Sequence, residues 1–206
     1  MAVTEAPDDD PGGPPPPSPA LVVVSGPAGS GKTTLAHALA AALGCPAICR
    51  DEIKEGMVHA TPGFVPGPGD ELTRRTLPVF FGVLELLLRA GVTTVAEAAF
   101  QDRVWRRRLE PLGPLARMRV VHCVVDADVA FERILRRGQE NSLRLAHADP
   151  QGPRDAAEQT RRHRTFDRFS GPVPWLEVDT TDGYRPGLSQ IVAFVNDSGS
   201  ARSWPS

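Results

Sequence analysis

The sequence predicts an α/β domain built on a five-stranded parallel β-sheet with helices on both faces. Five short runs of β-branched and other apolar residues alternate with stretches of helical composition, the order expected of β-α-β units. The runs are apolar almost throughout, which is typical of strands buried on both faces. With 206 residues, of which 41% are apolar and 23% charged, the chain suits one globular domain with tails.

Local composition places each element in turn. The expected strands are Leu21–Val24, Pro46–Cys49, Val92–Ala96, Arg119–Val125 and Trp175–Val178. The expected helices are Leu35–Leu43, Glu71–Arg89, Arg103–Leu115, Asp128–Arg137 and Leu188–Val195. The first helix is rich in Ala and Leu and stops at Gly44, a residue suited to the left-handed conformation that ends helices. In the second helix, Pro78 lacks an N–H group and predicts a kink or a break.

Both ends of the chain differ from the domain expected at 20–195. Residues 1–19 contain three consecutive Asp, four consecutive Pro and almost nothing apolar, so they cannot offset the entropy lost on ordering. We expect a disordered acidic, proline-rich tail there and a second disordered tail at 196–206. No run approaches the about 20 apolar residues of a membrane span, and no secretory leader is recognisable. We therefore expect a cytoplasmic protein, with its oligomeric state left open.

The most informative motif is Gly26-Pro27-Ala28-Gly29-Ser30-Gly31-Lys32-Thr33, which fits the phosphate-loop (P-loop) pattern G-x-x-x-x-G-K-[ST]. It follows the first strand directly and opens the first helix. The glycines let backbone N–H groups converge on an anion, and the helix N-terminus adds its positive end. We expect these eight residues and Thr34 to bind ATP, with Lys32 on the β- and γ-phosphates and Thr33 on Mg²⁺. The alternative is a chance glycine-rich turn.

A charged segment, Arg50-Asp51-Glu52-Ile53-Lys54, follows the second strand. Ligands of open α/β sheets bind outside the carboxyl ends of the strands, so this segment is expected beside the P-loop. A kinase needs a carboxylate to accept the proton of the acceptor hydroxyl, a catalytic role that Asp51 can fill. Lys54 lies one helical turn further on and could face the same substrate cavity. The alternative for Asp51 is an N-cap of the following helix.

Glu97 occupies the corresponding place after the third strand. A carboxylate there can hold Mg²⁺ or orient the substrate, and the small neighbours Ala96, Ala98 and Ala99 leave space around it. The alternative is a solvent-exposed carboxylate.

The helix predicted at Asp128–Arg137 carries two arginines on one polar face. Arg133 and Arg137 are four residues apart and should point together, where they could stabilise the charge that develops on transferring phosphate. The following segment, 138–168, is polar and arginine-rich, which favours a lid that closes over the nucleotide and excludes water. Its arginines could instead be solvated charges on a surface helix.

Together these motifs resemble the P-loop kinase family that includes zeta toxins, chloramphenicol phosphotransferase and the 5′-kinase domain of polynucleotide kinase. The resemblance covers about residues 21–195 and rests on 26–33, 50–54 and 132–138. It implies a P-loop NTPase fold of the nucleoside-kinase type with an arginine-rich lid. It also implies that Asp51 is the general base, that Lys32 binds phosphate, that Thr33 holds Mg²⁺, and that Arg137 clamps the transferring phosphate.

These observations predict an ATP- and Mg²⁺-dependent kinase that phosphorylates a hydroxyl of a small molecule. A polynucleotide 5′-hydroxyl kinase is the first alternative. It is disfavoured because the net charge is −2 and the chain has only eight Phe, three Trp and one Tyr for base stacking. Polynucleotide kinases also carry an arginine where this chain has Lys54, and lysine cannot form a bidentate pair. The second alternative is a non-catalytic switch that binds ATP or GTP and is read by a partner.

Overall fold

The computed structural model describes residues 18–67, 69–140, 160–161 and 163–197. The predicted tails fall on 1–17 and 198–206, outside the described residues, and so does most of the predicted lid, at 141–159 and 162. Whether these segments are tails and a lid stays a prediction.

Five parallel strands form one sheet in the order β2-β3-β1-β4-β5, which confirms the predicted fold class. The strands are β1 (Ala20–Ser25), β2 (Ala47–Cys49), β3 (Thr94–Glu97), β4 (Arg117–Val124) and β5 (Trp175–Asp179). The central strand, β1, pairs with β3 on one side and with β4 on the other, and all six of its residues are buried. The P-loop therefore leaves the sheet from its middle strand.

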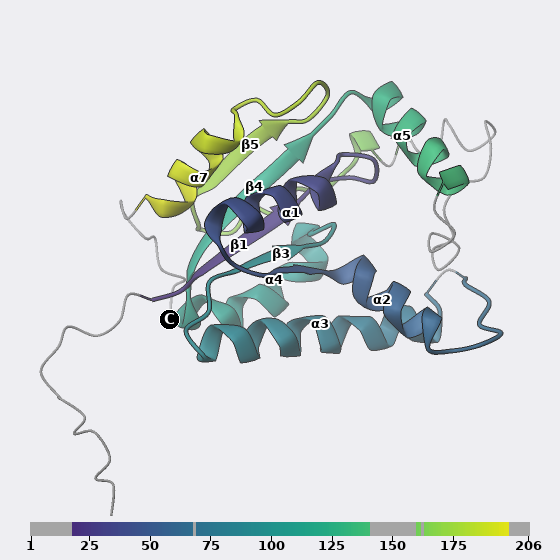
Figure 1. Cartoon of the computed structure of the whole chain (residues 1–206), viewed down its shortest axis with the longest axis horizontal. Coiled ribbons are helices and arrows are strands. Elements are labelled where there is room, and N and C mark those ends of the chain that lie inside the picture. The colour runs from purple at the N-terminus through teal and green to yellow at the C-terminus, as the bar shows by residue number, and fades with distance from the viewer. Residues whose placement is uncertain (1–17, 68, 141–159, 162, 198–206) are drawn as a thin grey trace, which may run out of the picture.

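Alternate residues of β1 enter two separate hydrophobic cores, one on each face of the sheet. Leu21 and Val23 face the core completed by α3 (Glu71–Arg89) and α4 (Asp102–Leu109). Val22 and Val24 face the core completed by α1 (Lys32–Leu43) and α7 (Leu188–Asn196). Figure 1 shows these two layers on either side of the strands. This arrangement explains why the strands lack an apolar–polar alternation.

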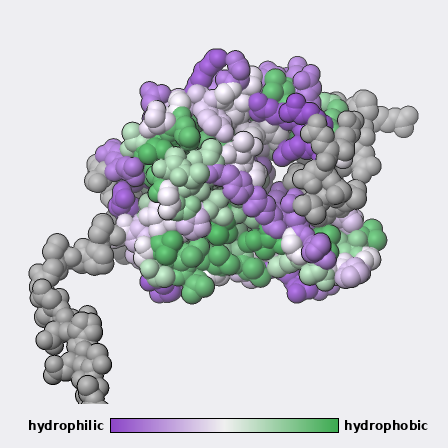
Figure 2. Space-filling view, in the orientation of Figure 1, coloured by the Kyte–Doolittle hydropathy of each residue, from purple (hydrophilic) through white to green (hydrophobic). Residues whose placement is uncertain are grey.

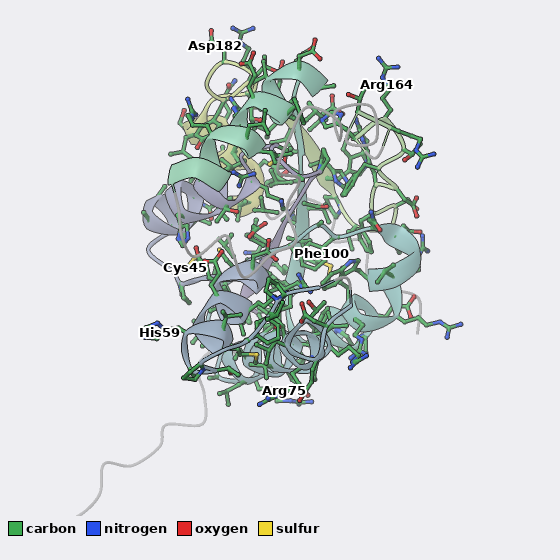
Figure 3. The ribbon with its side chains drawn as sticks, turned by 90° about the vertical axis from the view of Figure 1, so that its right-hand side faces the viewer. Cys45, His59, Arg75, Phe100, Arg164 and Asp182 are labelled. Carbon is green, nitrogen blue, oxygen red and sulfur yellow. The ribbon has the colours of Figure 1, made fainter. Side chains whose placement is uncertain are left out.

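Aromatic residues fill the core beneath α3. Phe100, labelled near the middle of the molecule in Figure 3, is fully buried, and its ring centroid lies 4.9 Å from that of Trp105 and 6.1 Å from that of Phe80. Part of the outer surface of this layer is also apolar: Figure 2 shows hydrophobic residues along the α3 side, where Val79 and Leu86 are exposed. Among the described residues, none of the helices is long and apolar enough to cross a lipid bilayer.

Two helical expectations need correction. The helix expected at Arg103–Leu115 ends at Leu109, and a 3-10 helix, η1 (Glu110–Leu115), replaces its second half. Pro111 and Pro114 cause this change because neither can donate a backbone hydrogen bond. The predicted break at Pro78 is wrong, because α3 runs through the proline and its apolar face on both sides packs into the core; the predicted kink stays a prediction.

A further helix, α2 (Arg50–His59), follows β2 directly. The predictions for Asp51 and Lys54 assumed a helix here, but its bounds were not predicted. It buries only one of its ten residues, Lys54, so it lacks the apolar periodicity by which helices are recognised. The helix α5 (Ala127–Glu140) extends the predicted Asp128–Arg137 by a few residues. It lies beside the carboxyl ends of β1 and β4 (Figure 1).

Candidate active site

The P-loop has the conformation that its glycines predict. Gly29 and Gly31 have φ angles of 78° and 69°, in the left-handed region that favours glycine. A Cβ atom on Gly29 would clash with the carbonyl oxygen of Ala130 in α5. The positive φ angle and this clash both exclude any residue other than glycine at position 29. The Leu35 N–H donates to the Gly31 carbonyl oxygen at 3.0 Å and begins the helical pattern. The loop therefore directs the N-terminus of α1 outward from the sheet edge.

Lys32, Thr33 and Glu97 meet at the carboxyl ends of β1 and β3. Glu97 is the last residue of β3 and pairs in register with Val24 of β1, which places it directly beside the P-loop. Its Oε1 atom lies 3.7 Å from Lys32 Nζ, and the Thr33 hydroxyl lies close enough to the same carboxylate to lower its pKa. The solvent-exposed alternative for Glu97 is wrong, because the residue is 1% exposed.

Burial raises the pKa of the Glu97 carboxyl above its ordinary value. The Lys32 ammonium and the Thr33 hydrogen bond oppose the shift, whereas the negative charge of Asp51 adds to it. The second carboxylate oxygen, Oε2, is buried and has no hydrogen-bond partner among the described residues. A buried carboxylate oxygen without a partner beside a hydroxyl is a donor set that suits Mg²⁺, which prefers oxygen ligands. The residues present therefore fit the metal that the motif implies.

Asp51 lies in the first turn of α2, close enough to Glu97 for its charge to act there. Its Oδ1 accepts a hydrogen bond from Arg50 Nη1 at 2.9 Å. The N-cap of α2 is Cys49 rather than Asp51, so the capping alternative is wrong. Asp51 is thus left with its side chain partly exposed, at 35%, next to the Lys32–Glu97 pair.

Lys54 is held in an ion pair of its own. Its Nζ atom lies 2.8 Å from Asp70 Oδ2, and both side chains are buried. Asp70 is the N-cap of α3 and also accepts from the Thr73 N–H at 2.7 Å and the Gly67 N–H at 3.3 Å. The structure therefore brings Lys54 together with the start of α3, and a direct contact between Lys54 and a substrate stays a prediction.

A polar clamp holds the P-loop from the side of β5. Arg133 in α5 donates from Nη2 to the carbonyl oxygens of Thr180 and Thr181 at 2.8 and 3.0 Å, and its Nη1 lies 3.5 Å from the Gly29 carbonyl oxygen. The Thr180 hydroxyl donates to the Ser30 carbonyl oxygen at 2.7 Å. Thr180 was not among the predicted site residues. Its position just after the fifth strand, where ligands of open α/β sheets bind, is the signal in the sequence that points to it.

Two cavities adjoin the P-loop. One, of about 320 Å³, lies between the loop, α5 and the segment after β5, and is lined by Thr34, Arg133, Arg136, Arg137 and Tyr184, among others. The other, of about 250 Å³, lies over Gly26 and the end of β4 and is lined by His122, His163, Arg164 and Arg168, among others. Arg133 and Arg137, the pair predicted from the sequence, therefore line the same cavity. Arg133 also donates hydrogen bonds to backbone carbonyl groups. Contact of either residue with phosphate stays a prediction.

Family membership follows from a match over most of the domain. A family profile described as "AAA domain" matches residues 21–165, a span that begins at β1 and includes the P-loop, Asp51, Glu97 and Arg133. The chain belongs to this family of P-loop kinase-like domains. The resemblance seen in the sequence is thereby confirmed. No curated protein sequence matches the chain.

Solved structures agree with this assignment. A kinase candidate from Chloroflexus aurantiacus J-10-fl is 27% identical, with a TM-score of 0.77, and the match covers 86% of this chain and 97% of that one. Shikimate kinase from Acinetobacter baumannii, in complex with shikimate, is 17% identical with a TM-score of 0.52 over 85% and 89% of the two chains. The APS kinase of Mycobacterium tuberculosis, in complex with AMPPNP and APS, is 15% identical with a TM-score of 0.56 over 88% and 100%. The last two show a shared fold.

Proposed function

We propose that the protein is an ATP- and Mg²⁺-dependent kinase that transfers the γ-phosphoryl group to a hydroxyl of a small molecule. The observation that carries this proposal is the convergence of Lys32, Thr33, Glu97 and Asp51 at the carboxyl edge of the sheet. These are a phosphate-binding lysine, two oxygen donors for a metal, and a carboxylate suited to accept a proton. A domain that only binds nucleotide has no need of the fourth group.

Each residue has a separate task in the proposed reaction. The P-loop N–H groups and the Lys32 ammonium bind the phosphates and neutralise their charge. Thr33 and Glu97 would hold Mg²⁺, which, when bound, neutralises charge on the β- and γ-phosphate oxygens. Asp51 orients the acceptor hydroxyl and takes its proton on a carboxylate oxygen as the O–P bond forms. Arg133 keeps the loop in place through the carbonyl groups that it binds.

The larger cavity suits the nucleoside part of ATP. It begins at Thr34, directly beyond the residues that would bind the phosphates, and it is bounded by Tyr184 and the arginines of α5. An aromatic ring and guanidinium groups can both stack on a purine base. An acceptor molecule would then approach from the side of Asp51 and α2.

Transfer of label from γ-labelled ATP tests this function. The full-length protein is incubated with Mg²⁺, labelled ATP and a panel of sugars, nucleosides, hydroxylated acids and short oligonucleotides. We expect label on a small hydroxyl compound, and we expect Asp51→Asn to slow this transfer by at least about a hundredfold while ATP still binds. Asp182→Asn is the matched control, because the Asp182 side chain is 92% exposed at the opposite end of the sheet edge.

Three results would contradict the proposal. Phosphoryl transfer at the wild-type rate by Asp51→Asn would show that Asp51 is not the general base. Label only on oligonucleotide 5′ ends would support the polynucleotide kinase instead. Tight ATP binding without transfer to any acceptor would support the switch.

A further inference from the structure

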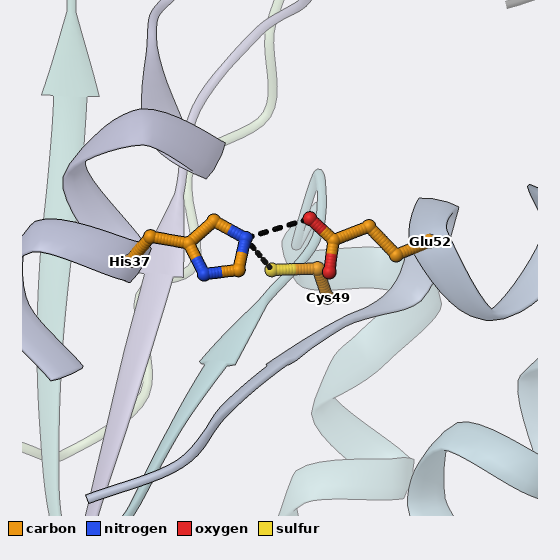
Figure 4. Close-up of side chains that lie close together, drawn as sticks. All are labelled: His37, Cys49 and Glu52. Carbon is orange, nitrogen blue, oxygen red and sulfur yellow. Dashed lines mark hydrogen bonds and ion pairs between the residues drawn. The ribbon is translucent and has the colours of Figure 1, made fainter. Parts of the chain in front are cut away.

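Three metal-binding side chains meet between α1 and α2, on the outer side of the P-loop helix. His37 comes from α1, Cys49 ends β2, and Glu52 lies in the first turn of α2; Figure 4 shows the three side chains pointing toward one another. His37 Nε2 lies 2.6 Å from Glu52 Oε1 and 3.7 Å from Cys49 Sγ. Their nearest ligand atoms all lie within 4.8 Å of one another. Within the described part of the chain, no other group of His, Cys, Asp and Glu converges in this way.

The distances fit a tetrahedral zinc ion after one small movement. With Zn–S of about 2.3 Å and Zn–N of about 2.05 Å, a tetrahedral angle places sulfur and nitrogen about 3.6 Å apart, close to the 3.7 Å between Cys49 and His37. The same calculation places nitrogen and carboxylate oxygen about 3.4 Å apart. The distance between Glu52 Oε1 and His37 Nε2 would therefore increase slightly, and their hydrogen bond would break. Both side chains are about half exposed and are free to make that movement.

The local charge also favours a cation. The carboxylates of Glu52 and Glu97 lie close enough to Cys49 for their charges to act on its side chain, so the thiol lies in a negative field. A divalent cation would neutralise that field and stabilise the thiolate.

We propose that His37, Cys49 and Glu52 form a zinc-binding site that borders the reaction centre and ties the P-loop helix to α2. Nitrogen and thiolate ligands select zinc over the magnesium that the oxygen donors Thr33 and Glu97 suit. Three protein ligands leave the fourth position to water. Because α2 carries Asp51 one residue before Glu52, zinc bound there would fix the base relative to the P-loop.

Zinc binding releases the proton of the Cys49 thiol to solvent as the Zn–S bond forms, and His37 binds through Nε2.

Titration of the metal-free, full-length protein with Co²⁺ and then with Zn²⁺ in excess Mg²⁺ tests this site. We expect one equivalent of Co²⁺ to give a thiolate-to-metal charge-transfer band, and Zn²⁺ to remove that band. Cys49→Ser should abolish the band, and His37→Gln should weaken zinc binding at least about tenfold, since even outer partners of metal ligands have effects of that size. Cys45→Ser is the matched control, because Cys45 lies nearby but outside the cluster.

The outcome is decisive even if one variant folds poorly. His37→Gln changes a half-exposed side chain, and zinc should raise the melting temperature of the wild-type protein but not of this variant. Absence of the band in the wild-type protein, or equal zinc affinity in the wild-type protein and His37→Gln, would overturn the proposal. None of these readouts depends on kinase activity, so the zinc site and the kinase can fail independently.

Discussion

Two lysine–carboxylate pairs, one at the end of β3 and one between α2 and the start of α3, differ in how completely their polar atoms are hydrogen-bonded. In the Lys54–Asp70 pair the charged atoms are 2.8 Å apart, and Asp70 accepts two backbone N–H groups as well. In the Lys32–Glu97 pair they are 3.7 Å apart, and Glu97 Oε2 has no hydrogen-bond partner among the described residues. Burial acts on both carboxylates. It raises the pKa of Glu97, whereas the hydrogen bonds of Asp70 outweigh it and hold the pKa of that carboxyl well below its ordinary value.

The difference separates structure from function at the same edge of the sheet. A buried charge that has all its partners stabilises the fold, while one that lacks a partner costs free energy unless a ligand completes it. Lys54 and Asp70 therefore anchor α2 to the start of α3. Lys32 and Glu97 are preorganised for phosphate and metal, and pay for that with incomplete hydrogen bonding.

Breaking the satisfied pair should have the largest effect on stability. Lys54→Met leaves the buried Asp70 charge without its cation, and we expect the free energy of unfolding to fall by about 3–5 kcal/mol. Lys32→Met should cost less than about 1 kcal/mol, because Glu97 can take up a proton when its looser partner is lost. Urea titrations of the two variants give this comparison directly. Equal losses would show that the two pairs have the same role.

Loss of the clamp should have the next largest effect. Arg133→Ala removes a guanidinium that donates to the carbonyl oxygens of Thr180 and Thr181, and we expect a loss of about 2–3 kcal/mol because hydrogen bonds to charged groups are the stronger ones. Arg136→Ala, on the same helix and lining the same cavity, is the control and should change stability by less than about 0.5 kcal/mol. If Arg133→Ala leaves the free energy of unfolding unchanged, the contacts of Arg133 do not stabilise the P-loop.

The two carboxylates should also make stability respond to pH in opposite directions. Glu97 has a folded-state pKa above its ordinary 4.5, so the native state binds the extra proton and stability falls as the pH rises through that window. Asp70 has a folded-state pKa below its ordinary 3.8, so its contribution is present at higher pH and is lost as the pH falls below 3.8.

Unfolding curves of Glu97→Gln and Asp70→Asn between pH 3 and pH 7 separate the two contributions. Glu97→Gln should abolish the decline above about pH 4.5, whereas Asp70→Asn should flatten the curve at the acidic end. The opposite assignment of the two effects would contradict the difference in hydrogen bonding described above.

The fold could be predicted because its signals are local. Each strand is a short apolar run, and the P-loop pattern fixes the end of β1 together with the start of α1. The failures are also local in origin. The extent of α2 was not predicted because only one of its ten residues is buried, so no apolar face marks the helix. The 3-10 helix η1 was not predicted because Pro111 and Pro114 end an α-helical pattern that the rest of the local composition continues.

The candidate site could be predicted only in part, because its contacts join distant segments. The motif and the strand ends drew attention to Lys32, Asp51 and Glu97, and the structure brings these residues to one edge. The Thr180 hydroxyl, in contrast, bonds a carbonyl group 150 residues away along the chain, and Lys54 pairs with an aspartate 16 residues away. Side-chain type and spacing carry no information about such partners.

Stabilisation by Mg²⁺ and ATP tests most directly whether the incompletely bonded pair is a ligand site. At a nucleotide concentration of 100 times the dissociation constant of the wild-type protein, we expect the free energy of unfolding to rise by about 2.7 kcal/mol. We expect Lys32→Met to lose most of this gain. A wild-type protein that Mg²⁺ and ATP do not stabilise, or a Lys32→Met variant that they stabilise equally, would contradict the assignment of this edge of the sheet as a nucleotide-binding active site.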